Sequence, residues 1–207
     1  MAIHLEEMHP ALVHFPVALL PLAVAADAVG TLTEDSAAFS FGQTAICIAA
    51  LGALAAAVTG LIAGEEVNVK GPSRDMLMTH RNLNFIATVL VTGMALWRLK
   101  HAKPSAAYLG VGAAGVGVIA YTAYLGGKLV YDVGVAVKPA HGIYRTDAPA
   151  LKSGEVASFI KTAGSDLVHG VEHMIEEVAN GQLVPTIITG LREPREVTDR
   201  PAAQSPA

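Results

Sequence analysis

Four long apolar runs constrain what this chain can fold into. They cover residues 10–30, 39–64, 78–97 and 105–131. A helix of about 20 apolar residues crosses the hydrocarbon core of a bilayer, so each run is long enough to span it. Because backbone groups cannot remain unpaired in lipid, all four runs are expected to be helices. The short connections between them predict an up-down bundle of antiparallel neighbours.

The composition agrees with a membrane protein. Hydrophobic residues make up 52% of the chain and charged residues 15%, whereas a soluble domain has about 25% charged residues. The net charge of −4 argues against nucleic acid as a partner. Glu6 and Glu7 precede the first run where a signal peptide would have basic residues, so this run is expected to remain in the mature protein.

The sequence therefore predicts an all-α integral membrane protein with two parts. Residues 1–138 form the four-helix transmembrane domain, and residues 139–207 form an extramembrane amphipathic helix followed by an extended tail. The amphipathic helix is expected at about 154–180, on the membrane or on a partner, with Gly164-Ser165 as a point where it could break. Its apolar positions at helical spacing are Val156, Phe159, Ile160, Leu167, Val171, Ile175 and Val178.

The first run opens with the motif His9-Pro10-Ala11-Leu12-Val13-His14-Phe15-Pro16. Pro10 suits the first turn of a helix, and Pro16 and Pro21 are expected to kink it. Histidine inside a membrane is costly without a partner, so an intramembrane histidine is by default a functional-site hypothesis. Asp27, near the other end of this run, is expected to snorkel to the interface.

Several polar residues lie at one end of the bundle. His9 and His14 open the first helix and His80 opens the third, which runs in the same direction, so His14 and His80 are expected at similar depth, facing each other. Two neutral imidazoles on facing helices can serve as the axial ligands of haem b. Arg81 would then pair with the haem propionates.

The role of His9 stays open at this point. It is five positions from His14, about 140° around a helix, so it could cap the helix, ligate a second site or hydrogen-bond to a first ligand. The alternative for all these histidines is that they only hydrogen-bond to backbone or headgroups. Cys47 is the single cysteine, which excludes a C-x-x-C-H attachment, so one or two haems would be held non-covalently.

Other motifs are less specific. The run His169-Gly170-Val171-Glu172-His173 matches H-x-x-E-H, a metalloprotease pattern, but a solvated helix face explains it better. Small residues recur every four positions at Gly52, Ala56, Gly60 and Gly64, which favours close helix packing. The pair Gly126-Gly127 is expected to end or bend the fourth helix.

The distribution of basic residues bears on orientation. The chain before the first helix has no Lys or Arg, whereas residues 98–103 form a basic cluster at the opposite end. Lys70, Arg74 and Arg81 lie on the same side as the termini and oppose a periplasmic location for them. The contrast between the N-terminus and the 98–103 cluster nevertheless favours periplasmic termini in a bacterial cytoplasmic membrane under the positive-inside rule.

Four motifs, in order, resemble a known family. They are His9-Pro10-x-x-Val13-His14-Phe15-Pro16, Thr59-Gly60-Leu61, His80 with Asn82-Leu83-Asn84, and Leu125-Gly126-Gly127-x-Leu129-Val130-Tyr131-x-x-Gly134-Val135. Over about residues 8–138 the chain resembles the bacterial predicted membrane proteins catalogued as domain of unknown function 2231. The resemblance implies a four-helix integral bundle without an assigned activity. Relatives sometimes have Rieske-type or c-type cytochrome domains, which implies redox work at the outer face of the membrane.

The leading hypothesis is an electron-transfer subunit with haem b between the first and third helices, ligated by His14 and His80. Its partners would be the lipid bilayer, other membrane or periplasmic redox subunits, and quinone as an option. One alternative is a non-redox structural or assembly subunit whose tail docks a partner. Another is a small transporter or metal-handling protein using His9, His14, His80 and His141.

Overall fold

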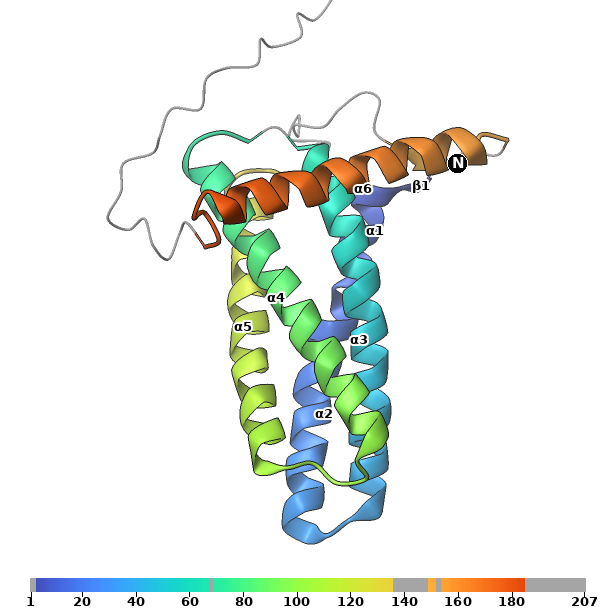
Figure 1. Cartoon of the computed structure of the whole chain (residues 1–207), viewed down its shortest axis with the longest axis vertical. Helices are drawn as coiled ribbons and strands as arrows, with labels where there is room; N and C mark the ends of the chain where they lie inside the picture. Colours follow the sequence, from blue (N-terminus) through green and yellow to red (C-terminus); the bar gives the residue numbers. More distant parts are fainter. Residues whose placement is uncertain (1–2, 68, 136–148, 152–153, 185–207) are drawn as a thin grey trace, which may run out of the picture.

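The computed structural model describes residues 3–67, 69–135, 149–151 and 154–184, and the fold is all-α as predicted (Figure 1). In this part of the chain, four helical segments are long and apolar enough to cross a membrane. The first consists of α1 (Leu5–Leu12) and α2 (His14–Thr33). The others are α3 (Ser36–Glu65), α4 (Pro72–Lys100) and α5 (Ala106–Tyr131). The prediction of four membrane-length helices is thus confirmed. The first three begin three to six residues before the predicted spans, and α5 begins one residue after its predicted start.

The helices alternate in direction along the chain, so α1, the start of α4 and the ends of α3 and α5 lie at one end of the bundle (Figure 1). We call it the histidine end, because His9, His14 and His80 lie there. Neighbours along the chain pack together, and α2 also packs against α5, which closes the bundle. Helix α1 packs mainly against α3. The topology is therefore the predicted up-down bundle.

Pro10 lies elsewhere in the helix than the sequence predicts, whereas the interruption next to Pro16 is in line with the kink expected there. The helix begins at Leu5, so Pro10 lies inside α1 and not in a first turn. The interruption falls at Val13, three residues before Pro16, which lacks the N–H that would bond to the Leu12 carbonyl. Pro21 lies inside α2, which continues past it to Thr33. The first span is thus divided near the histidine end.

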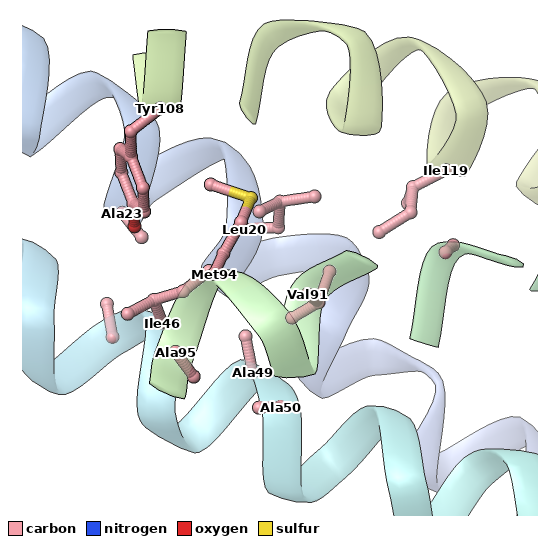
Figure 2. Close-up of a cluster of buried hydrophobic side chains, with 12 residues drawn as sticks. Leu20, Ala23, Ile46, Ala49, Ala50, Val91, Met94, Ala95, Tyr108 and Ile119 are labelled. Atoms are coloured by element: carbon pink, nitrogen blue, oxygen red, sulfur yellow. The ribbon is translucent and has the colours of Figure 1, made fainter. Parts of the chain in front are cut away.

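The core in the middle of the bundle combines a few large side chains with many alanines. Figure 2 shows Leu20, Ile46, Val91, Met94 and Ile119 meeting from four helices. Buried alanines, on α3 above all, let the helix backbones approach closely, as small-residue stripes do in lipid. They are Ala23, Ala45, Ala49, Ala50, Ala87 and Ala95. The structure also shows that Gly126-Gly127 does not end α5, which continues to Tyr131.

Helix α6 (Val156–Ala179) lies across the histidine end (Figure 1). It is continuous through Gly164 and Ser165, so the break considered from the sequence is absent. It packs against α3, where Ile62 meets Ala163, Phe159 and Leu167. A two-residue antiparallel pairing of β1 (Ile3–His4) with β2 (Ala150–Leu151) joins the start of the chain to the segment before α6. His141 and the tail from 185 onwards lie outside the described residues.

An ion pair is buried at the opposite end of the bundle, between α2 and α4. Arg98 and Asp27 are both 0% exposed. Arg98 Nη2 lies 2.7 Å from Asp27 Oδ1, and Nε lies 3.1 Å from Oδ2. The remaining guanidinium N–H groups donate to the carbonyls of Phe39, His101 and Ala102. All five donors of the arginine are therefore used.

This pair corrects one expectation from the sequence. Asp27 does not snorkel to the interface, because its carboxylate is buried against Arg98. The exposed cations at this end are Lys100 and Lys103, and Lys103 pairs with Glu34. Because Arg98 is neutralised by Asp27 inside the bundle, it adds no net charge to the 98–103 cluster on which the orientation argument depends. The periplasmic location of the termini therefore stays a prediction.

Candidate functional site at the histidine end

His9, on α1, is anchored to α3. Its Nδ1 lies 2.9 Å from the carbonyl oxygen of Ala56. The ring rests over Gly60, where an added Cβ would lie 2.6 Å from His9 Cε1. Only a glycine at this position leaves room for the imidazole. The sequence places Gly60 in the small-residue stripe of this helix, and its role is to seat a histidine.

His80, on α4, is anchored to α5 in the same manner. Its Nδ1 lies 2.9 Å from the carbonyl oxygen of Thr122. The ring rests over Gly126, where an added Cβ would lie 2.9 Å from Cε1. The amide of Asn84, one turn further along α4, lies 3.2 Å from His80 Nε2 and donates to the His80 carbonyl at 2.8 Å.

These contacts fix the protonation of both rings. A carbonyl oxygen can only accept, so Nδ1 carries the proton in His9 and in His80, and Nε2 of the neutral imidazole keeps its lone pair. An N–H bond from one ring nitrogen to a backbone carbonyl also orients histidines that ligate metals through the other nitrogen. The arrangement provides two oriented, unprotonated nitrogens inside the bundle.

His14 is placed differently. Its side chain is exposed, and its Nδ1 lies 2.6 Å from the carbonyl of Pro10 in the preceding turn. The described contacts therefore favour His9 over His14 as the companion of His80. The pairing of His14 with His80 stays a prediction from the sequence.

Arg81 is engaged by α6. Its Nη2 pairs with a carboxylate oxygen of Glu177, whose other oxygen lies 3.3 Å from Arg74 Nη2. Asn82, also on α4, donates to the carbonyl of Leu183 at 2.7 Å. These contacts hold the C-terminal part of α6 over the start of α4. The sequence analysis missed Glu177, because an acid on an amphipathic helix gives no sign of a partner 96 residues away.

We expect Glu177→Gln to loosen α6 by about 1–3 kcal/mol, since one carboxylate serves two arginines in a partly buried setting. Hydrogen exchange of the α6 amides in the detergent-solubilised protein measures this directly. Glu176→Gln is the matched control, because Glu176 is an exposed neighbour on the same helix. Equal exchange in the two variants would contradict a role of Glu177 in docking α6.

The H-x-x-E-H motif falls on the outer part of α6. His169 is exposed, and His173 Nδ1 lies 3.0 Å from Glu65 at the end of α3. Across the described residues, no three His, Cys, Asp or Glu side chains are grouped so that they could hold a metal ion. His173 thus helps to attach α6 to α3.

Comparison with known proteins agrees with this bundle. Residues 6–139 match the family described as predicted membrane protein, domain of unknown function 2231. The chain belongs to this family. The match covers all four spans and the His9, His14 and His80 motifs, as the sequence resemblance predicted. No curated protein matches the chain, and neither does any solved structure. Membership in family 2231 establishes a membrane protein and assigns it no activity.

Proposed function

We propose that this member of family 2231 is an integral membrane electron-transfer subunit that holds non-covalent haem b between its first and third spans. His80 and His9 would hold the haem iron, a revision of the His14–His80 pair expected from the sequence. The observation that supports this most is the shared geometry of the two histidines, with each Nδ1–H on the carbonyl of a neighbouring helix. We infer a larger respiratory or dehydrogenase complex as its setting.

The donor set fits such a cofactor. The two neutral imidazoles would hold the iron of a haem, and the group would supply one-electron oxidation and reduction when bound. Ligation by His80 requires Asn84 to give up its hydrogen bond to Nε2, and Asn84 keeps the His80 carbonyl as an acceptor. Donation from Nδ1 increases the basicity of Nε2 and limits rotation of each ring.

Other residues would shield the site. Helix α6 covers this end of the bundle, and Arg81 is paired with Glu177. Arg81 would be shared between Glu177 and any propionate, because a guanidinium has five donors. A location in the bacterial cytoplasmic membrane, with the histidine end at the outer face, would let a periplasmic redox subunit or a quinone reach it.

The test is a dithionite-reduced minus oxidised absorption spectrum of detergent-purified protein from cells supplied with a haem precursor. We expect b-type bands in the wild type and their loss in His9→Ala and His80→Ala. His101→Ala, an exposed histidine at the opposite end, is the control that keeps the bands.

The His14→Ala variant separates the two possible ligand pairs. Bands kept in His14→Ala support His9 as ligand, whereas bands lost in His14→Ala and kept in His9→Ala restore the pair expected from the sequence. A featureless wild-type spectrum overturns the haem proposal and favours a structural or assembly subunit.

A further inference from the structure

Helix α6 has three distinct faces, and one of them has no partner in the described part of the chain. The bundle-facing residues are Ala163, Asp166, Gly170 and Glu177, all buried, within a sector of about 60° at 100° per residue. A second face, which we call the aliphatic stripe, spans about 120°. It consists of Val156, Ile160, Val168, Ile175 and Val178, from 43% exposed at Val178 to 63% at Ile160. The third face is polar.

The contacts with α3 show which way the aliphatic stripe points. His173 bonds to Glu65, the last residue of α3. Gly170 abuts the carbonyl of Leu61, one turn deeper, where an added Cβ would lie 3.1 Å from the oxygen. Viewed along the axis of α6, a step of three residues towards its N-terminus rotates the side-chain direction by about 60°, so Gly170 points about 60° away from His173 and deeper into the membrane. Continuing that turn past the bundle-facing residues leads to the aliphatic stripe, which therefore points towards the middle of the bilayer.

The surface next to the stripe is also apolar. Leu51, Leu54 and Val58 are exposed on α3, deeper in the bundle than the α6 crossing. They belong to the surface that a membrane protein presents to lipid. The aliphatic stripe thus adjoins the lipid-facing surface of the bundle, near the level at which α3 ends.

The polar face lies on the other side of α6. It contains Lys161, Ser165, His169, Glu172 and Glu176, all exposed, with more acids than lysines. A helix with separate apolar and polar faces that lies in the membrane plane buries its apolar side at the boundary between headgroups and acyl chains. The acidic excess gives no attraction to anionic lipids, so apolar burial would drive the insertion.

We propose that α6 is an in-plane membrane helix whose aliphatic stripe inserts into the acyl-chain boundary of the leaflet at the histidine end. Its bundle-facing side closes that end of the bundle, and its polar face is in water. The proposal is independent of haem, because it rests on α6, α3 and the exposure of the stripe alone.

The test uses the full chain with Cys47→Ala and one added cysteine labelled with an environment-sensitive fluorophore, in vesicles of phosphatidylcholine only. The variants are Ile160→Cys and Ile175→Cys on the stripe, with Lys161→Cys and Glu172→Cys as matched positions on the polar face. We expect the stripe labels to emit at shorter wavelength, to be quenched by nitroxide on lipid acyl chains and to be protected from iodide. The polar-face labels should show the reverse pattern.

Three outcomes would overturn the proposal. Iodide quenching at all four positions would mean that the stripe faces water. Protection of the stripe labels from both quenchers would mean that protein covers it, either a second copy of this chain or a different partner. A need for anionic lipid to obtain the expected pattern would also contradict insertion driven by apolar burial.

Discussion

Arg98→Met is expected to lower the free energy of unfolding by about 3–5 kcal/mol, because it leaves Asp27 as an unpaired charge in a dry interior. Asp27 is 0% exposed, and Gly42 on α3 packs so closely that an added Cβ would lie 2.5 Å from Oδ1. The Asp27 carboxylate is therefore enclosed between α3 and Arg98, away from solvent. Asp27→Leu is expected to cause a similar loss, because Arg98 would keep only its three carbonyl acceptors.

Thermal unfolding of the detergent-solubilised variants measures this effect. The double variant Asp27→Leu/Arg98→Met should recover much of the loss, since replacing both members of a buried pair by apolar residues is often neutral or stabilising. Lys103→Met is the control, because its partner Glu34 is exposed and such pairs contribute at most about 1 kcal/mol. An Arg98→Met variant as stable as Lys103→Met would refute the role given to this pair.

The spans could be predicted because the length and hydropathy of a run are local properties of the sequence. The location of His9, His14 and His80 at the same end of the bundle followed from the number of membrane crossings between them. The Asp27–Arg98 pair could not be predicted in this way, because its members are 71 positions apart and each lies near the end of a span, where snorkelling is the simpler expectation. Only the packing of α2 against its neighbours shows that this position is closed to water.

The choice between His9 and His14 depended on the backbone. The sequence reasoning assumed one helix starting at Pro10, which would leave His9 outside it. In the structure the helix starts at Leu5 and is interrupted at Val13, so α1 packs separately against α3 and turns His9 inward. Proline positions indicate that an interruption of the helix is near, but they do not indicate in which direction each histidine side chain will point.

Replacing the glycine under either histidine ring, Gly60 or Gly126, by alanine is expected to have the second large effect on stability. Gly60→Ala would place a Cβ 2.6 Å from His9 Cε1, and Gly126→Ala would place one 2.9 Å from His80 Cε1. Each ring is held by its Nδ1 bond to a backbone carbonyl and cannot retreat without losing it. Overpacking of this kind costs about 1–3 kcal/mol, so both variants should unfold at lower temperature and lose any b-type bands with the displaced ring.

Each variant has a matched control in the same helix. Gly64 on α3 and Gly127 on α5 have no atom within 4 Å of an added Cβ. Gly64→Ala and Gly127→Ala should therefore leave stability unchanged or raise it by up to about 1 kcal/mol, because alanine loses less backbone entropy in a helix than glycine. If Gly60→Ala had the same melting temperature as Gly64→Ala, the His9 ring would not rest on α3. The melting temperatures test the packing of the two histidine rings whether or not haem is bound. This prediction can therefore be contradicted without any bearing on the proposed cofactor.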